Sequence, residues 1–327
     1  LEEGRKVGKA ITGDQYREDI MLGTALVNMY GKCGDFDHAK MIFDQMPKRD
    51  VALWSAIVTA CASNGRNEEA LHLFHQIYIN NLLPDPIAYV AALNSCSNAC
   101  RSEDGLRIHT ELIFFGYEKE LQVGTSLVDM YGKCGFLGSA RYVFLLMGHR
   151  DVVTWTAMIA SFSQNDYTEE ALTLFKRMLS EGVIPNNVTF ACALDACGSL
   201  ASIKDGEYIH ASIVEYGGLH TDPLVGNALV SLYGKCKRVH RAESVFVKMH
   251  SRDAVSWNAM ISGYTRNGLC DEALKCFKQM KDMGVCPNVV TYICCLKACR
   301  IVGSLEIGKG IDLDVRKRGL LQKNVIL

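Results

Sequence analysis

Apolar residues recur at helical spacing along the whole chain, in pairs of segments separated by glycine. In residues 121–151, Leu127, Met130 and Tyr131 mark one apolar face, and a second face follows after Gly135. Steps of three, four and seven residues place side chains on one side of an α-helix, and glycine between two such faces is typical of a tight interhelical turn. The pattern predicts a helical hairpin, and it shows none of the alternation typical of strands.

The hairpins follow one another in a long repeat. The motif Tyr-Gly-Lys-Cys at residues 30–33 returns at 131–134 and 233–236, at intervals of 101 and 102 residues. Each period divides into three hairpins, of 31, 35 and 35 or 36 residues. Because one hairpin cannot cover its own apolar faces, the hairpins must stack on their neighbours. We therefore predict an all-α fold, a right-handed superhelical solenoid of helix-turn-helix repeats.

These periods divide the chain into nine complete repeats between two partial ones. The complete repeats are residues 20–50, 51–85, 86–120, 121–151, 152–186, 187–222, 223–253, 254–288 and 289–324. Residues 1–19, which resemble the end of a long repeat, and residues 325–327 are the expected partial repeats, so the array is expected to continue beyond this chain.

Composition and charge restrict the class of protein. With 49% apolar and 22% charged residues, the 327-residue chain can bury a large core. It has no run of the roughly 18 apolar residues that a membrane helix needs. The net charge of −1 is unusual for a nucleic-acid-binding protein, because phosphate attraction normally shows as a basic surplus. Lys32, Lys133 and Lys235 recur in phase and could supply that attraction locally, although a cation near a helix C-terminus is favourable without any ligand.

The 14 cysteines do not have the arrangement of a disulfide framework. We expect two sets of them to be small buried residues, namely Cys33, Cys134 and Cys236, which recur in phase, and Cys61, Cys96, Cys192, Cys197 and Cys299, which lie in runs of small residues. A reducing compartment follows from this expectation.

Longer motifs within one period carry a family resemblance. They are Val-Val-Thr-Trp-Thr-Ala-Met-Ile at 152–159, Glu-Glu-Ala-Leu-Thr-Leu-Phe at 169–175 and Gly-Val-Ile-Pro-Asn at 182–186. With the repeat lengths, they resemble pentatricopeptide repeat (PPR) proteins, and more narrowly the plant PLS subclass, in which short, standard and long motifs alternate. The resemblance implies an array that reads single-stranded RNA, one base per repeat.

In that family, the fifth residue of a repeat's first helix and the last residue of the repeat together contact one unpaired base. Short polar side chains suit this role because they offer hydrogen-bond donors and acceptors at fixed reach. The pairs implied here are Thr24 with Asp50, Ser55 with Asp85, Thr125 with Asp151, Thr156 with Asn186, Asn227 with Asp253, and Asn258 with Asn288. The first three resemble guanine readers, and the others resemble readers of adenine, uracil, and cytosine or uracil, respectively.

The long repeats have apolar fifth residues, Val90, Ala191 and Ile293, which cannot read a base edge by hydrogen bonding. The resemblance therefore implies the RNA core 5′-GGxGAxU(C/U)x-3′, with unread bases at the long repeats. It also implies that second residues pack against base faces, and these are Ala52, Val153, Leu224 and Val255.

Each polar candidate also has a structural explanation. Asp50, Asp151 and Asp253 each precede a predicted helix, so they can cap that helix as well as read a base. Trp54, Trp155 and Trp257 could stack on bases, but their apolar spacing favours a place in the core.

No catalytic constellation is found in the sequence. Relatives in the PLS subclass often carry a C-terminal zinc deaminase, and His109-Thr110-Glu111 matches half of its signature, but the chain has no Cys-x-x-Cys. We expect no enzymatic activity, no cofactor and no metal site in this segment, so that any deamination would belong to another domain or a partner.

The resemblance implies a mitochondrial or chloroplast protein that supplies the RNA address for C-to-U editing or another processing step. Its partners would be single-stranded organellar RNA and editing proteins acting in trans, with no role for a membrane. The alternative is a peptide-binding scaffold like the tetratricopeptide repeat proteins, whose groove holds a peptide rather than RNA.

Overall fold

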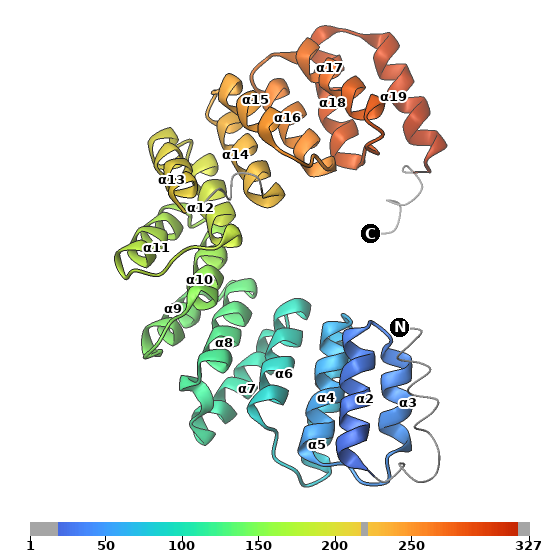
Figure 1. Ribbon diagram of the computed structural model, residues 1–327, viewed down its shortest axis with the longest axis vertical. Helices are drawn as coiled ribbons and strands as arrows, with labels where there is room; N and C mark the ends of the chain where they lie inside the picture. Colours follow the sequence, from blue (N-terminus) through green and yellow to red (C-terminus); the bar gives the residue numbers. More distant parts are fainter. Residues whose placement is uncertain (1–18, 217–221, 320–327) are drawn as a thin grey trace. The chain divides into compact units, whose positions relative to one another are not determined.

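The structure, a computed structural model, describes residues 19–216 and 222–319 (Figure 1). Its described residues form α-helices and one short 3₁₀-helix, with no strand among them, which confirms the all-helical fold. They form two compact units, divided between Gln164 and Asn165. The two expected partial repeats, 1–19 and 325–327, lie outside the described residues except for Asp19. No described helix combines the length and hydrophobicity that crossing a membrane would require.

The first unit contains four complete hairpins and the first helix of a fifth. Its α-helices are α2 (Ile20–Lys32), α3 (Phe36–Gln45), α4 (Val51–Ser63), α5 (Asn67–Ile79), α6 (Pro86–Ala99), α7 (Ser102–Phe115), α8 (Leu121–Lys133), α9 (Leu137–Leu146) and α10 (Val152–Gln164). A 3₁₀-helix at Tyr117–Lys119 precedes α8.

The second unit begins with a single helix, α11, and continues with four hairpins. Its helices are α11 (Thr168–Ser180), α12 (Asn187–Ser199), α13 (Ile203–Glu215), α14 (Pro223–Lys235), α15 (Val239–Lys248), α16 (Ala254–Arg266), α17 (Cys270–Asp282), α18 (Val289–Val302) and α19 (Leu305–Lys317). The division of the chain into short, standard and long repeats stays a prediction.

First helices stack on first helices in both units. In the first unit α2, α4, α6, α8 and α10 contact one another in series, and in the second unit α12, α14, α16 and α18 do the same. Within each unit, a second helix that lies between two first helices packs against both, as α5 does against α4 and α6. One layer of each unit is therefore made of first helices, which carry the candidate base-reading residues.

The tryptophans belong to the core, as their spacing predicts. Trp54, Trp155 and Trp257 are at most 4% exposed. Each meets a phenylalanine from the preceding second helix edge to face, and the Trp54–Phe43 ring centroids are 4.7 Å apart. Such pairs add about 0.5–1.5 kcal/mol beyond the area that they bury. A buried ring cannot act as a stacking platform for a base.

The glycine of the Tyr-Gly-Lys-Cys motif permits close helix contact. A Cβ atom on Gly31 would lie 2.5 Å from the Cβ of Ala60 on α4, and one on Gly234 would lie 3.0 Å from the Cα of Gly263 on α16. Asn64 and Asn267 join the same helices, since their Nδ2 atoms donate to the carbonyl oxygens of Gly31 and Gly234 at 3.0 and 2.9 Å.

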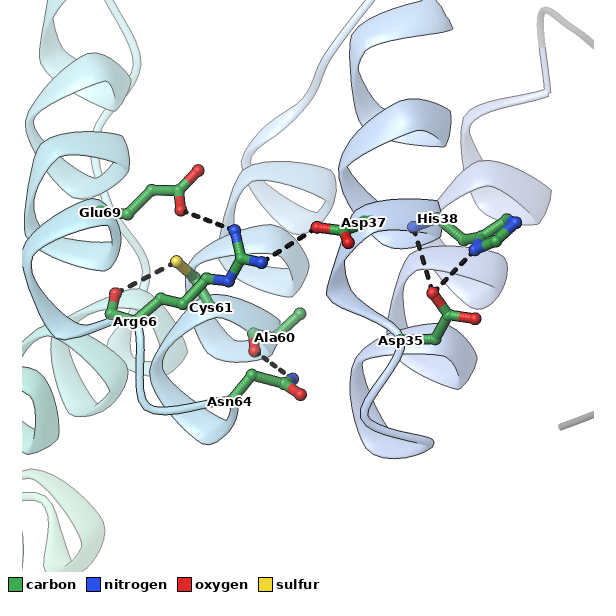
Figure 2. A network of polar contacts seen from close by, with 8 residues as sticks. All are labelled: Asp35, Asp37, His38, Ala60, Cys61, Asn64, Arg66 and Glu69. Atoms are coloured by element: carbon green, nitrogen blue, oxygen red, sulfur yellow. Dashed lines mark hydrogen bonds and ion pairs between the residues drawn. The ribbon is translucent and has the colours of Figure 1, made fainter.

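The turns of neighbouring hairpins are also linked (Figure 2). The guanidinium of Arg66, just before α5, bonds Asp37 on α3 at 3.0 Å and Glu69 on its own helix at 3.4 Å. Asp35 caps α3 and accepts from the ring nitrogen of His38 at 2.7 Å. The two ion pairs of Arg66 are exposed, so each contributes at most about 1 kcal/mol.

The cysteines of the motif are not buried, and the expectation for them was wrong. Cys33 is exposed and Cys134 and Cys236 are half-buried, because each is the C-cap of its helix and its backbone, rather than its thiol, is used. Cys192 is half-buried as well. Cys61, Cys96, Cys197 and Cys299 are buried as expected, and no disulfide is present among the cysteines, all of which lie in the described ranges. Burial raises the pKa of the Cys61 thiol to about 12, so it is unreactive.

The residue after each of these C-caps has a left-handed backbone. Gly34 and Gly135 have φ angles of 79° and 80°, whereas the third copy of the motif has Lys237, with φ at 59°. A Cβ is unfavourable in this conformation, and glycine avoids the penalty.

We expect Lys237→Gly to stabilise the protein by about 1 kcal/mol, measured by urea denaturation. Lys237→Ala, which keeps the Cβ, is the control, and an equal gain from alanine would contradict the explanation.

Candidate nucleic-acid interface

In the candidate pairs, the second member caps the first helix that follows it. Asp50, Asp85 and Asp253 accept from the backbone N–H three residues later at 2.9, 2.8 and 2.9 Å. Asn288 does the same at 3.1 Å with its Oδ1 atom. The cap uses one side-chain oxygen, so the other oxygen or nitrogen of the side chain remains for another partner.

Three of the expected pairs are in direct contact across their hairpins. The hydroxyl of Ser55 lies 2.7 Å from Asp85 Oδ1, and Asn258 Nδ2 donates to Asn288 Oδ1 at 3.1 Å. Asn227 Nδ2 approaches Asp253 Oδ1 less closely, at 3.5 Å. In each pair, the fifth residue of a first helix therefore meets the cap of the following first helix.

A fourth pair is joined through an intermediate hydroxyl. Thr125 and Asp151 both bond the side chain of Thr154, on the first turn of α10, at 2.7 and 2.9 Å. Thr154 is fully buried, whereas Thr125 and Asp151 are half-buried. Thr125 and Asp151 therefore lie on the same side of the first unit.

Among the described residues, Thr24 and Asp50 are not joined in this way. The hydroxyl of Thr24 donates to its own helix, at Ile20 O, 2.8 Å away, and no hydrogen bond links it to Asp50 within the described residues. Thr156 lies in the first unit, where its hydroxyl donates to Val152 O at 2.6 Å. Asn186 lies in the second unit and forms a capping box with Thr189.

Apolar second residues are exposed beside these pairs. Val153, Leu224 and Val255 are 54%, 44% and 56% exposed, and Ala52 is exposed as well. Such side chains lose water when a flat apolar surface covers them, and a base face is such a surface.

The second unit has a surface hollow of about 540 Å³ over α12, α14, α16 and α18. Its lining includes three base-reading candidates, two base-packing candidates and two cations: Asn227, Asn258, Asn288, Leu224, Val255, Lys235 and Arg266. A smaller hollow of about 370 Å³ in the first unit lies over α4, α6 and α8 and is lined by Ile87, Val90 and Lys133, among others.

Acidic side chains accompany the recurrent lysines. Lys133 lies 2.9 Å from Asp129, and Lys235 lies 2.7 Å from Asp195, while Lys32 is exposed at the end of α2. Ser97 also donates to Asp129, at 2.7 Å. Asp129 and Asp195 were not among the expected site residues, and their ion pairs reduce the local positive charge that the lysines alone would give.

The carboxyl of Asp253 stays ionised in this setting. Burial raises its pKa, but hydrogen bonds from Ser256, Asn227 and the backbone of Val255 outweigh that effect and hold the pKa below its usual value. Asp253 therefore presents an acceptor at neutral pH.

The residues that resemble half of a deaminase signature do not form a metal site. His109 is 9% exposed, and its Nδ1 lies 2.8 Å from the hydroxyl of Tyr131. Glu111 accepts from the hydroxyl of Tyr78 at 2.5 Å. Throughout the described residues, no group of three or more His, Cys, Asp or Glu side chains could hold a metal ion.

The family relationship follows from this arrangement and from comparison with known proteins. The PPR repeat model matches residues 24–51, 52–80, 125–152 and 227–253, and the PPR repeat family model matches 150–199 and 252–300. These matches cover more than half of the chain. The chain belongs to the pentatricopeptide repeat family.

Similar proteins of Arabidopsis thaliana carry the same family name. Pentatricopeptide repeat-containing protein At2g33680 is 40% identical over 88% of this chain, and the chloroplastic protein At1g11290 is 38% identical over the full length of this chain. The mitochondrial protein At2g03380 is 35% identical over 94% of the chain. The chain spans about 40% of the length of the first two relatives and 44% of the third.

A solved structure has the same fold. The crystal structure of the pentatricopeptide repeat protein PPR10 in complex with an 18-nt psaJ RNA element matches 95% of this chain with a TM-score of 0.78. The sequence identity is 17%, and the match covers 47% of that chain. At this identity the likeness establishes the fold, a solenoid of helical hairpins.

Burial lowers the pKa of His109, and the charge of Glu118 opposes this only in part. In the pH range just below the ordinary histidine pKa of about 6.5, the unfolded chain therefore binds more protons than the folded one, and stability falls as the pH falls. We expect His109→Gln, which can still bond Tyr131, to show a smaller loss of unfolding free energy between pH 7.5 and 5.5, measured by urea denaturation. His72→Gln on the exposed surface of α5 is the control. Equal pH dependence in wild type and His109→Gln would contradict this explanation.

Proposed function

We propose that this chain is a sequence-specific module for binding single-stranded RNA, in which a fifth residue and a helix-capping residue read one base between them. The observation that supports this most is the meeting of Ser55 with Asp85, Asn227 with Asp253 and Asn258 with Asn288 on the layer of first helices. A peptide groove has no need for polar side chains paired in this way. The structural likeness to PPR10, which was solved with RNA, agrees with the proposal.

Each part of the interface has a defined role in this proposal. The polar pairs form hydrogen bonds to the Watson–Crick edges of unpaired bases. The exposed side chains of Val153, Leu224 and Val255 pack against base faces, where stacking contributes affinity with little dependence on sequence. Lys235 and Arg266 attract phosphate, which positions the strand without reading it. Thr24 with Asp50, and Thr156 with Asn186, are proposed to act as the other pairs do.

The cellular role that we propose is that of an address for RNA processing in an organelle. The relatives are named as chloroplastic or mitochondrial, and both compartments are consistent with reduced cysteines. The alternation of repeat lengths favours the PLS subclass and hence C-to-U editing. Catalysis would then be supplied by another domain or by editing proteins recruited in trans.

The proposal is tested by a gel-shift titration with RNA that carries the core 5′-GGxGAxU(C/U)x-3′. Each matched pair is worth about 1–3 kcal/mol, by analogy with base contacts in DNA, so several pairs together give large discrimination. We expect a scrambled RNA of the same composition to bind at least about tenfold more weakly. Equal binding of the two RNAs would remove base reading and favour the peptide-binding alternative.

A single substitution tests the register. Asn227→Thr leaves Asp253 in place and converts the pair to the combination found at Thr125 and Asp151. We expect the preferred seventh base of the core to change from uracil to guanine, measured by competition among four RNAs that differ only at that base. Preferences at the other positions are the internal control. An unchanged seventh base would show that the register or the pairing is wrong.

A further inference from the structure

The third residue of a first helix lies beneath the pair that precedes it. Thr154 and Thr291 occupy this position on α10 and α18, and both are fully buried. Each hydroxyl contacts the two members of the preceding pair, with Thr291 Oγ1 at 2.6 Å from Asn258 Oδ1 and 3.1 Å from Asn288 Oδ1. Neither threonine was expected to take part in recognition.

The hydrogen bonds around Thr291 can be assigned completely. Its oxygen accepts the backbone N–H of Asn288 at 3.0 Å. Asn288 Oδ1 accepts the backbone N–H of Thr291 and an Nδ2 proton of Asn258, both at 3.1 Å, so both of its lone pairs are used. The single hydroxyl proton of Thr291 therefore goes to Asn258 Oδ1, the shortest contact in the group.

This assignment fixes both amides. Turning the amide of Asn258 over would place its nitrogen against the hydroxyl proton of Thr291 and its oxygen against Asn288 Oδ1. Turning Asn288 over would place its nitrogen against the backbone N–H of Thr291. Both changes bring like groups together and leave buried polar atoms unsatisfied, at a cost of about 1–3 kcal/mol each. The second Nδ2 proton of Asn258 and the Nδ2 protons of Asn288 thus remain for the hollow that both residues line.

Thr154 gives the Thr125–Asp151 pair the opposite hydrogen-bonding character, with acceptors facing outward. Asp151 is a carboxylate that accepts from both the backbone N–H and the hydroxyl of Thr154 at 2.9 Å. A hydrogen bond to a charged oxygen is stronger than one to a neutral hydroxyl, so the proton of Thr154 goes to Asp151. Thr125 must then donate its own proton to Thr154, at 2.7 Å, and it presents lone pairs beside the second carboxylate oxygen.

Pairs without a threonine at this position are held differently. Ala88 has no hydroxyl, and Ser55 bonds Asp85 directly at 2.7 Å. Ser256 bonds its own cap, Asp253, at 3.0 Å and leaves Asn227 Oδ1 buried without a hydrogen-bond partner among the described residues. A third-residue hydroxyl that contacts both members of a pair therefore distinguishes Thr125–Asp151 and Asn258–Asn288 from Ser55–Asp85 and Asn227–Asp253.

We propose that Thr291 is a positioning residue that makes the Asn258–Asn288 pair a donor pair, selective for cytosine over uracil, and that Thr154 makes the Thr125–Asp151 pair an acceptor pair, selective for guanine. Cytosine presents two adjacent acceptors, N3 and O2, whereas uracil presents an N3–H donor that would face another donor. Guanine presents its N1–H and N2–H donors to an acceptor pair. This inference rests on the proposed function and resolves the cytosine-or-uracil ambiguity of the eighth base.

The test uses the whole chain and RNAs that differ only at the eighth base of the core. Wild type is expected to bind the cytosine RNA about tenfold more tightly than the uracil RNA, since one good contact gives discrimination of this order. Thr291→Val keeps the branched shape but removes the hydroxyl, and it should reduce the ratio to within about twofold of unity. Thr291→Ser keeps the hydroxyl and should retain most of the preference.

Thr154→Val is the matched variant at the other site. It should weaken guanine preference at the fourth base and leave the eighth unchanged, while Thr291→Val should do the reverse. A merely structural role would lower affinity for all RNAs equally in both variants. Any one of three results would overturn the inference. They are an equal loss of affinity for all RNAs, an unchanged cytosine preference in Thr291→Val, and a uracil preference in wild type.

The two proposals fail in different ways. Wild type that does not distinguish the core from scrambled RNA overturns the proposed function, and the polarity inference with it. Wild type that selects the core, combined with Thr291→Val that keeps the wild-type ratio at the eighth base, overturns the inference alone. Thermal denaturation of each variant identifies loss of folding. If Thr291→Val does not fold, the preference of Thr291→Ser at the eighth base and of Thr154→Val at the fourth base tests the inference instead.

Discussion

The N-terminal helix cap formed by the second member of each candidate pair is the interaction on which the candidate interface depends. A first helix leaves backbone N–H groups without partners in its first turn, and an Asp or Asn side chain before it accepts one of them. The side chain is then held at a fixed place, as Asp85 is by the N–H of Ala88 at 2.8 Å. Because the preceding first helix is packed alongside, its fifth residue reaches the same place. Helix stacking and capping thus build the Ser55–Asp85, Asn227–Asp253 and Asn258–Asn288 pairs before any ligand is present.

Preorganisation of this kind affects binding. The side chains that we propose as base readers do not have to be collected from several rotamers, because their partners already hold them. Asn258, for example, is 8% exposed and is bound on both sides by Asn288 and Thr291. Immobilising a side chain on binding costs about 0.5–1.5 kcal/mol, and such a pair avoids part of that cost. A peptide or RNA that meets fixed groups is also selected more strictly by their geometry.

Helical spacing was enough to predict the helices and much of the core. The tryptophans were assigned correctly because a large apolar side chain at helical spacing has few other places to go. The cysteines of the repeated motif were assigned wrongly because periodic recurrence does not distinguish a core position from a C-cap, where the backbone matters more than the side chain. Cys33 is the clearest example, since its N–H bonds Met29 O at 3.0 Å while the thiol is exposed.

The candidate site was less accessible to sequence reasoning. Thr154 and Thr291 recur at the third place of a first helix, but a hydroxyl there has an ordinary explanation as part of a capping box. Their contacts with Thr125 and Asn258 depend on the distance between stacked helices, which spacing along the chain does not give. The ion pair of Lys235 with Asp195 joins residues 40 positions apart and was missed for the same reason.

The cap also separates folding from recognition. Asp and Asn cap a helix about equally well, because each needs only one oxygen for the backbone N–H. The other terminal atom differs, since aspartate offers a second acceptor and asparagine offers two donors. Asp253 and Asn288 illustrate this, because both accept from the N–H three residues later, at 2.9 and 3.1 Å, yet the remaining atom of Asp253 is an acceptor and that of Asn288 is a donor. A repeat can therefore change the hydrogen-bonding pattern on its surface while its helix start and its packing stay the same.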